Sequence, residues 1–395
     1  MRKTFLPFAK PEIADDAIND VVTCLKSGWL TTGPRTIEFE EMFKTYAGAK
    51  HAVSLSSATA GLHGALLSLG LKKGDEVITT PMTFAATVNT IIFAGGTPVL
   101  ADIDPKTLNI IPENIEKKIT PRTKAIIPVH FAGRPCDMAA IEAIAQKHNL
   151  WIIEDAAHAL GAAWGGASPC GGELIGKPKA KKAAVFSFHP TKNITTGEGG
   201  IVCTEDENMA EYLAVFRQHG MSKGAWNRYA AKGKTHYDIL LPGLKYNMMD
   251  IQAVIGISQM KRLAAFNKRR AEIVAEYMEA FKGLEGLILP APVKKGDIHS
   301  WHIFSPLIDT DKLKITRDEF MKLMGAQNIG TALHYQAVHL FSYYQQNYGW
   351  KQGDCPAAEY VASRIVSLPL FPAMTDEDVR DAIKYTIQII KENKK

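Results

Sequence analysis

Apolar and polar positions along the first two-thirds of the chain alternate between a strand pattern and a helix pattern. Short apolar, largely β-branched runs occupy residues 51–55, 76–80, 98–102, 124–130, 151–155, 185–188 and 200–204. Helical periodicity lies between them, at residues 11–27, 38–46, a stretch ending near Gly70, 85–93 and 138–148. Continuous apolar strands separated by amphipathic helices are typical of a mostly parallel α/β sheet with crossover helices.

The last third of the chain has a different pattern. Apolar residues recur at intervals of three and four over residues 250–282, which predicts one long helix leading into a C-terminal unit. Strands are expected there at 301–305 and 330–333, and helices at 317–324, 357–363 and 376–391. We therefore expect a large domain over residues 1–255 and a smaller α+β domain over residues 256–395, linked by this helix.

Composition favours a globular enzyme-sized protein over a nucleic-acid-binding protein. Of the 395 residues 46% are hydrophobic, and 46 Lys and Arg against 41 Asp and Glu leave a net charge of only +5. The clearest basic cluster, residues 177–182, has no interleaved aromatic residues and is expected to be a solvated loop that could attract anionic substrates. The stretch 165–182, rich in Gly, Pro and Lys, is the least ordered candidate.

The cysteines and the apolar runs bear on location. The five cysteines show neither a C-x-x-C pair nor a metal-like spacing with histidine, which favours a reducing compartment and argues against a disulfide or metal framework. No apolar run reaches the roughly 18–20 residues of a membrane span, and the N-terminus lacks an apolar export segment. The expected location is the cytoplasm, without membrane contact.

Candidate chemistry centres on Lys192, in the run V-F-S-F-H-P-T-K-N-I-T-T-G-E-G-G-I-V at residues 185–202. Apolar runs flank this lysine, and Glu198 is the one acidic residue of the window. Desolvation in such surroundings lowers the pKa of a lysine and frees its amine as a nucleophile or Schiff-base former. A glycine-rich turn with an incidental lysine explains this window equally well.

Asp155 ends the apolar run W-I-I-E-D, and ligands collect at the carboxyl ends of strands in an open α/β sheet. A carboxylate there could pair with a protonated ring nitrogen, as pyridoxal phosphate requires of its protein. The alternative is that Asp155 is an N-cap of a helix beginning at Ala156.

Three further features are ambiguous when each is taken alone. Ser57, Ala58 and Thr59 precede a helix whose free N–H groups and dipole could hold a phosphate, with Ser187 as a further hydroxyl donor, or they could simply cap the helix. Phe84 could stack on a cofactor ring, although a lone phenylalanine after a strand usually lies in the core. A lone histidine such as His158 more often has a structural than a functional role.

Taken in order, these motifs form a known pattern. The small-residue turn at 56–61, T-F at 83–84, E-D-A-A-H at 154–158 and S-F-H-P-T-K-N-I-T-T-G-E-G-G at 187–200 resemble the DegT/StrS family of pyridoxal-phosphate-dependent nucleotide-sugar aminotransferases. The resemblance covers nearly the whole chain, from S-G-W-L-T-T-G-P at 27–34 to S-L-P-L-F-P-A-M-T at 367–375. It implies the type I, aspartate aminotransferase-like fold, with a mostly parallel mixed seven-stranded sheet and a smaller α+β domain.

The resemblance also implies a role for each matching residue. Lys192 would form the Schiff base with pyridoxal phosphate and then act as general base, while Asp155 would pair with the ring nitrogen. His158 would help to fix Asp155 or the ring-hydroxyl side. Ser57, Ala58, Thr59 and Ser187 would bind the phosphate, Phe84 would stack on the ring, and Asn247 would reach the phosphate of a neighbouring subunit. Trp29, Thr31, Thr32, His189 and His334 would line the sugar-nucleotide pocket.

The implied reaction moves the amino group of L-glutamate, through pyridoxamine phosphate, to a nucleotide-linked keto-sugar. K-Y-N at 245–247 and T-K-N-I-T at 191–195 are most similar to family members that aminate a UDP-4-keto-pentose. Two departures from those members, Gln336 and a longer 165–182 stretch, lie where substrate choice could be set. A sugar dehydratase, a carbon-3 aminotransferase and a non-catalytic regulatory protein on the same fold are the alternatives; dehydratases of the family carry histidine in place of the lysine. The expected assembly is a homodimer with shared active sites.

Overall fold

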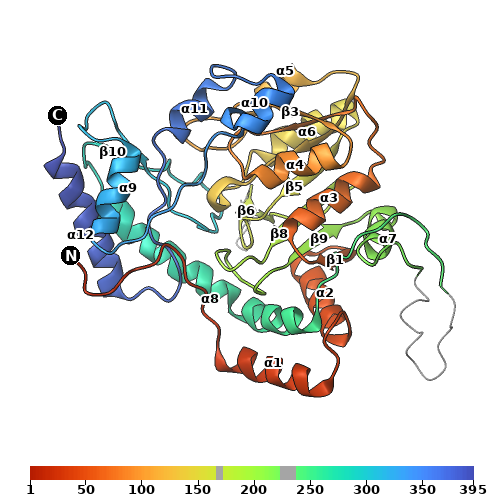
Figure 1. The fold of residues 1–395 in the computed structure, drawn as a ribbon. Helices are drawn as coiled ribbons and strands as arrows, with labels where there is room; N and C mark the ends of the chain where they lie inside the picture. Colours follow the sequence, from red (N-terminus) through yellow and green to blue (C-terminus); the bar gives the residue numbers. More distant parts are fainter. Residues whose placement is uncertain (166–171, 223–236) are drawn as a thin grey trace.

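A seven-stranded mixed sheet organises the first two-thirds of the protein (Figure 1). The structure, a computed structural model, describes residues 1–165, 172–222 and 237–395. The strands lie in the order β1-β9-β8-β5-β4-β2-β3. Their bounds are β1 (His51–Leu55), β2 (Glu76–Thr79), β3 (Thr97–Leu100), β4 (Thr123–Ile127), β5 (Trp151–Asp155), β8 (Lys182–Ser187) and β9 (Gly200–Thr204).

The sheet is mostly parallel, as the sequence predicts. The pairs β3–β2, β2–β4, β4–β5 and β5–β8 are parallel, whereas β9 is antiparallel to both β8 and β1. All strands except β9 therefore point in one direction, and their carboxyl ends meet at one edge of the sheet. That edge is where ligands of open α/β sheets bind.

Helices cover both faces of the sheet, which explains why its strands are apolar throughout. Successive residues of β5 enter opposite cores: Ile152 packs with α2 (Pro34–Ala47), α6 (Met138–His148) and the start of α8. Ile153 packs with α3 (Ala58–Ser68), α4 (Ala85–Phe93) and α7 (Glu207–Phe216). Burial on both faces gives continuous apolar runs instead of strict alternation.

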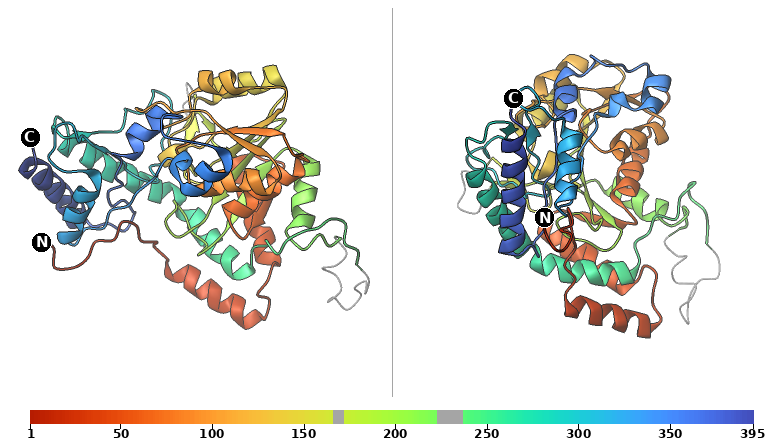
Figure 2. Two further views of the ribbon diagram at one scale, coloured as in Figure 1. Left: turned by 45° about the horizontal axis from the view of Figure 1, so that its top comes forward. Right: turned by 60° about the vertical axis from the view of Figure 1, so that its left-hand side comes forward.

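The 31-residue helix α8 (Asp250–Ala280) joins the sheet to a C-terminal unit (Figures 1 and 2). Its first half, including Ile257, lies in the core of the sheet, and its second half, including Tyr277, lies in a separate core with α9 (Arg317–Ala326) and α12 (Asp376–Glu392). Leu6 also packs in that core, so the first residues of the chain join the C-terminal unit. None of the helices in the described ranges combines the length and the apolar character that a membrane span requires.

The remaining elements are short. Helices α1 (Asp15–Ser27), α5 (Pro112–Lys118), α10 (Ser342–Tyr348) and α11 (Pro356–Ala362) lie on the surface of these two units, and two small sheets pair β6 (Ala163–Trp164) with β7 (Glu173–Leu174) and β10 (Leu287–Ile288) with β11 (Leu307–Ile308).

Two predicted strands of the C-terminal unit are wrong. The 301–305 and 330–333 segments form only single bridges, Phe304 with Leu368 and Ala332 with Ser367. Trp301 adopts a left-handed φ of 47°, which interrupts an extended strand, and Leu333 and its neighbours turn toward a cavity instead of joining a ladder. The apolar side chains of these two segments pack in the hydrophobic clusters without forming strands.

The prediction of a solvated basic loop at 177–182 is wrong for Lys179 and Lys182, whereas Lys177 and Lys181 are exposed as expected. Lys182 begins β8, is only 2% exposed and contacts Glu142 and Glu154 at 2.9 and 3.0 Å. Lys179 contacts Glu142 and Glu173, at 2.7 and 2.9 Å. Acidic partners distant in the sequence therefore draw these lysines inward. Residues 166–171 of the expected least-ordered stretch lie outside the described residues.

Candidate active site

A cavity of about 430 Å³ lies at the carboxyl ends of β5 and β8, and we call it the Lys192 cavity. It collects side chains from the segments that follow β1, β2, β4, β5 and β8 and from the 333–335 segment of the C-terminal unit. Ten of the site residues predicted from the sequence line it: Ser57, Ala58, Thr59, Phe84, Asp155, His158, Ser187, His189, Lys192 and His334. Motifs that are far apart along the chain thus meet in one cavity.

Four other predicted residues do not line this cavity; they form a cluster of their own beside the end of α1. Asn247 donates from Nδ2 to Thr32 Oγ1 at 2.8 Å and to Thr31 Oγ1 at 3.3 Å, and Trp29 Nε1 donates to the Thr32 carbonyl at 3.2 Å. We call these four residues the Asn247 cluster. It adjoins β1, because Asn247 bridges Leu55 in the sheet.

Lys192 lies on the loop between β8 and β9, a position that fits a reactive amine. Its backbone N–H donates to His189 O, and Thr195 and Thr196 bind the Phe188 carbonyl from the far side of the loop. Burial lowers the pKa of Lys192 to about 8, against the opposing attraction of Asp155. No described carboxylate forms an ion pair with its ammonium group. A substantial fraction of this lysine is therefore neutral at mildly alkaline pH, as nucleophilic attack requires.

Asp155 is held at the end of β5 by a chain of hydroxyl groups. Its Oδ2 accepts from Thr87 Oγ1 at 2.7 Å, and Thr87 Oγ1 lies 2.8 Å from Thr83 Oγ1. Its Oδ1 accepts the Ala157 N–H at 3.2 Å. The carboxylate is thus fixed in orientation and faces the cavity. Thr87 was missed in the sequence, because Thr83 precedes α4 and only the fold brings Thr87 beside Asp155.

The alternative interpretation of Asp155, as the N-cap of a helix beginning at Ala156, is wrong. The chain makes consecutive tight turns there, with Ala159 N–H donating to Ala156 O and Ala162 N–H to Ala159 O. These are bonds to the third residue back and not the fourth, so no α-helix forms and His158 is not one helical turn from Asp155.

The turn before α3 has the geometry of a phosphate cradle. Ser57 is both a cap and a lining residue, since its Oγ accepts the Ala60 N–H at 3.1 Å. The N–H groups of Ala58 and Thr59 have no acceptor in the described part of the chain. Ser187 lies opposite Gly200 in the β8–β9 ladder, and a Cβ on Gly200 would come within 2.4 Å of Ala58 N. The lack of a side chain at 200 lets the helix N-terminus approach the strand that carries Ser187.

Phe84 and His158 form part of the cavity wall. Phe84 is 62% exposed and its ring centroid lies 6.1 Å from that of Tyr335, so the core alternative is wrong. His158 Nδ1 accepts the Ala132 N–H at 3.2 Å, and its Nε2 lies 2.8 Å from Tyr335 Oη. It makes no hydrogen bond with Asp155, whose partners are Thr87 and Ala157. Tyr335 was not predicted, because only the fold brings it beside His158.

The two histidines expected to bind substrate occupy different environments. His189 is exposed, and its Nδ1 lies 2.9 Å from Thr191 Oγ1. His334 Nδ1 lies 2.9 Å from Ser367 Oγ, and burial, aided by the charge of Lys192, lowers the pKa of His334 to about 4. His334 is therefore a neutral hydrogen-bonding group near neutral pH.

The residues present fit a phosphorylated pyridine aldehyde. A helix N-terminus with free N–H groups suits the phosphate, the fixed carboxylate of Asp155 suits a protonated ring nitrogen, and Lys192 suits the aldehyde carbon. Across the ranges that the structure describes, no three His, Cys, Asp or Glu side chains gather so that they could hold a metal ion.

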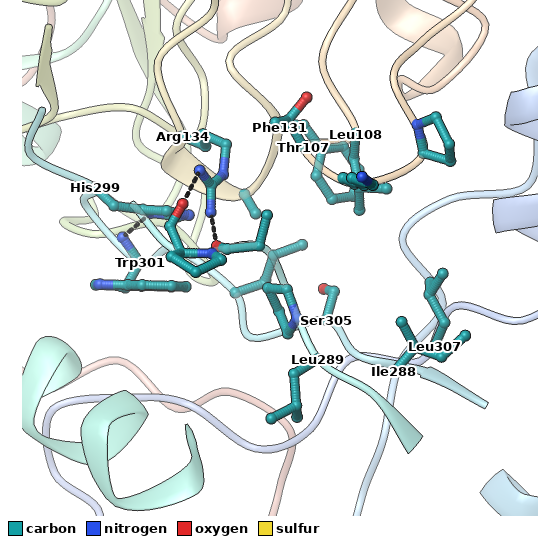
Figure 3. A pocket seen from close by; sticks show the side chains of 17 residues that line it. Thr107, Leu108, Phe131, Arg134, Ile288, Leu289, His299, Trp301, Ser305 and Leu307 are labelled. Atoms are coloured by element: carbon teal, nitrogen blue, oxygen red, sulfur yellow. Dashed lines mark hydrogen bonds between the residues drawn. The ribbon is translucent and has the colours of Figure 1, made fainter. Parts of the chain in front are cut away.

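A second cavity, of about 270 Å³, lies where the sheet meets the C-terminal unit (Figure 3). Arg134 crosses the boundary and donates to the carbonyls of Ala291 and Pro292. On the same side His299 and Trp301 stack, with ring centroids 3.7 Å apart. None of the predicted site residues lines this cavity, which is an interdomain joint and not the chemical centre.

Comparisons with known proteins agree with this geometry. Residues 11–386 match the family described as "DegT/DnrJ/EryC1/StrS aminotransferase family". The chain is 46% identical over 391 residues to the spore coat polysaccharide biosynthesis protein SpsC of Bacillus subtilis, covering 99% of this chain and 98% of that protein. The structure resembles PseC of Helicobacter pylori, an aminotransferase involved in the biosynthesis of pseudoaminic acid, with a TM-score of 0.88, 29% identity, and coverage of 98% and 100%.

Spr1654 of Streptococcus pneumoniae, which has been solved in a PLP form and a PMP form, is also similar. The TM-scores are 0.87 and 0.88, each with 30% identity over 98% of this chain and 99% of the other. The family match spans nearly the whole chain and includes every residue that lines the Lys192 cavity. The chain belongs to the DegT/DnrJ/EryC1/StrS aminotransferase family.

Proposed function

We propose that this protein is a sugar aminotransferase that uses pyridoxal phosphate to move the amino group of L-glutamate to the keto carbon of a nucleotide-linked sugar. The observation that carries the proposal is the meeting of Lys192, Asp155 and the turn at 57–59 in one cavity. Lys192 is half-buried there with a lowered pKa, which distinguishes it from the lysines of the solvated surface.

The cofactor suits both the family and the cavity. Pyridoxal phosphate supplies an aldehyde for amine exchange and a cationic ring that withdraws electrons from the reacting carbon. Ser57, Thr59, Ser187 and the N–H of Ala58 would hold its phosphate, and Phe84 would cover its ring. Asp155 would keep the ring nitrogen protonated, because a fixed carboxylate favours the cationic partner. Lys192 would anchor the cofactor and then, as a free amine, carry protons at the reacting carbon.

A nucleotide-linked sugar is proposed as amino acceptor because of the relatives. SpsC is named for spore coat polysaccharide biosynthesis and PseC for the biosynthesis of pseudoaminic acid. The runs at 191–195 and 245–247 favour a UDP-4-keto-sugar, so amination at carbon 4 is the first regiochemistry to test.

We further propose that two copies of the chain share their active sites. The Asn247 cluster lies outside the Lys192 cavity of its own chain, yet it contains residues expected to touch phosphate and sugar. Trp29 is 49% exposed, and its neighbours on α1, Ile18, Val22 and Leu25, are exposed apolar side chains. An exposed apolar face of this kind is typical of a surface that a second subunit covers.

A substrate panel tests the activity. The purified protein, reconstituted with pyridoxal phosphate, is incubated with L-glutamate and a set of UDP- and dTDP-linked 3-keto and 4-keto sugars. We expect 2-oxoglutarate and an amino sugar, with carbon 4 identified by NMR as the aminated position of a UDP-linked product. Amination only at carbon 3, or only of dTDP sugars, would correct the substrate and leave the reaction class intact.

Lys192→Ala provides the control for chemistry in the Lys192 cavity. It should remove the cofactor absorbance of the lysine adduct and abolish 2-oxoglutarate formation, because no other lysine or arginine lines the described cavity. Full turnover by this variant would overturn the proposal.

A further inference from the structure

The hydrogen-bonding state of His158 follows from its two neighbours. Nδ1 accepts the backbone N–H of Ala132 at 3.2 Å, so this nitrogen carries a lone pair and no proton. A neutral imidazole has one protonated nitrogen, which must then be Nε2. Burial, with smaller contributions from Lys192 and His334, lowers the pKa of His158 well below its ordinary value and keeps the ring neutral. The Nε2–H therefore donates to Tyr335 Oη, 2.8 Å away.

This assignment determines the orientation of the Tyr335 hydroxyl. Because Oη accepts from His158, its own hydrogen must point elsewhere. In the described part of the chain, Oη has no second partner, although Tyr335 lines the Lys192 cavity. A half-buried hydroxyl with an unused hydrogen is a ready donor to an oxygen atom in that cavity.

The ring of Tyr335 is held on several sides. It stacks on His158 with centroids 5.8 Å apart and planes at 20°, and it meets Phe131 edge-on at 6.1 Å. His158 is itself fixed from behind, because Ser300 Oγ donates to its carbonyl at 2.9 Å and the His302 ring packs 4.4 Å from its own. The hydroxyl is thus preorganised, which makes a hydrogen bond in a dry site effective.

We propose that Tyr335 is the fixed hydroxyl donor of the Lys192 cavity, acting on an oxygen acceptor of the bound reactants, and that His158 is a positioning residue that acts through it. The acceptor is either an oxygen of the keto-sugar or the ring oxygen of the cofactor. This inference rests on the proposed aminotransferase function. It replaces the expectation that His158 fixes Asp155, because Thr87 and Ala157 hold that carboxylate.

The first test needs neither cofactor nor substrate. Long-range ¹H–¹⁵N NMR of ¹⁵N-histidine-labelled apo-protein, with His158→Gln used to assign the signal, should show His158 in the neutral Nε2–H form. Tyr335→Phe should shift the Nε2 resonance and leave the tautomer unchanged, because Ala132 still donates to Nδ1. An Nδ1–H tautomer or a protonated ring would overturn the inference whatever reaction the protein catalyses.

The second test follows the two half-reactions by absorbance in single turnovers. Tyr335→Phe should slow at least one half-reaction about tenfold, as loss of about 1.4 kcal/mol of transition-state stabilisation would. Slowing only with the keto-sugar identifies the sugar as acceptor. Slowing with both glutamate and sugar, together with a shifted cofactor absorbance, identifies the cofactor. Unchanged rates in both halves would contradict the proposal.

Two comparisons separate positioning from a general loss of structure. Tyr343→Phe makes the same change on an exposed tyrosine of α10 and should leave both half-reactions unaffected. His158→Gln keeps a donor toward Oη and should retain more of the rate than His158→Ala. In the Tyr335→Phe background, His158→Ala should have little further effect on the affected half-reaction, because His158 acts through the missing hydroxyl. Additive losses would assign His158 a separate role.

Discussion

The Lys192 cavity combines one amine of reduced basicity with histidines that are kept neutral. His158 and His334 line the cavity and His302 packs on His158, and burial is the largest cause of the lowered pKa of each of the three. The charge of Lys192 lowers all three further. Four basic groups confined together cannot all be protonated without mutual repulsion. The wall therefore offers neutral hydrogen-bond donors and acceptors, and the lysine remains the cation of the site.

The lowered pKa of Lys192 predicts a cost to stability that depends on pH. A lysine with a pKa of about 8 when folded and 10.5 when unfolded destabilises the fold by about 3 kcal/mol while both states are protonated. Lys192→Met should therefore stabilise the apo-protein at about pH 7, by up to about 3 kcal/mol in urea unfolding. The gain should shrink as the pH rises from 8 toward 10.5, because the folded lysine loses its proton first.

Lys177→Met is the matched control, since Lys177 is exposed. It should change the free energy of unfolding by less than about 0.5 kcal/mol at either pH. A Lys192→Met variant no more stable than the wild type at about pH 7 would show that the ammonium group is well solvated.

At the scale of helices and strands, the sequence predicts local periodicity well and fails where contacts are distant. The sheet strands and α4 and α6 agree with the pattern because each buries a continuous apolar face. The predicted strand at 301–305 is wrong because the sequence does not show whether an apolar run has a neighbouring strand to pair with. The prediction for Lys182 is wrong for a related reason. Its partners Glu142 and Glu154 are 40 and 28 positions away in the sequence, so no local pattern indicates that this lysine is buried.

The approach of β9 to the start of α3 predicts a specific effect of Gly200→Ala. The added Cβ would lie 2.4 Å from Ser57 C and Ala58 N, which are backbone atoms that cannot rotate away. The helix N-terminus must shift, so the affinity for pyridoxal phosphate should fall by about tenfold or more, equivalent to about 1.4 kcal/mol. Equilibrium dialysis of the cofactor against the apo-protein measures this change.

Gly325→Ala serves as the control, because Gly325 lies in α9 with no atom within 4 Å of the added Cβ. It should leave cofactor affinity unchanged and raise the free energy of unfolding by about 0.5–1 kcal/mol through helix propensity. Undiminished cofactor affinity in Gly200→Ala would mean that the turn at 57–59 does not hold the phosphate.

The opposite face of β5 from Asp155 carries a buried charge network that predicts a stability effect. Glu154 contacts Lys182 at 3.0 Å and His130 at 2.8 Å, and its side chain is fully buried. Burial alone would raise the pKa of Glu154, but Lys182 and His130 outweigh it and hold the pKa below its usual value. Lys182→Met should therefore cost about 3–5 kcal/mol in urea unfolding, because Glu154 would remain buried without its cation.

Two further variants check that burial is the cause. Adding Glu154→Gln to Lys182→Met should recover much of the loss, since an amide tolerates the missing charge. Lys147→Met removes an exposed pair with Glu116 of similar geometry, 2.6 Å, and should cost less than about 1 kcal/mol. Equal costs for the two lysines would show that the 182 network is solvated.

At the scale of the whole molecule, the sequence predicts the family and the fold, and the structure shows which of the predicted site residues lie together. The family, the fold and the pyridoxal phosphate chemistry that it predicts are confirmed. The residues of the Lys192 cavity follow strand ends, so the sheet topology brings them together. The Asn247 cluster is held instead by contacts between the loop that joins α1 to α2 and the segment before α8, more than 200 residues apart, and does not line the cavity of its own chain.

This placement predicts that two inactive variants will complement each other. Lys192→Ala disables the cavity of its own chain, while Asn247→Asp places a negative charge where a phosphate of the second copy is proposed to bind. In a mixed dimer, the chain with Asn247→Asp keeps Lys192 and receives an intact Asn247 from its partner. Co-refolded equal mixtures should therefore regain about a quarter of the wild-type activity, since half of the dimers are mixed and each has one intact site.

The outcome distinguishes an active site shared between two chains from one built by a single chain. If Asn247 served its own chain, each mixed dimer would contain one site without the lysine and one without the asparagine, and the mixture would stay inactive. Asn247→Asp also faces Thr31 and Thr32, so circular dichroism and sizing of each variant must first match the wild type. With both variants folded and dimeric, recovered activity can arise only from a site built by two chains, because neither chain alone carries both residues.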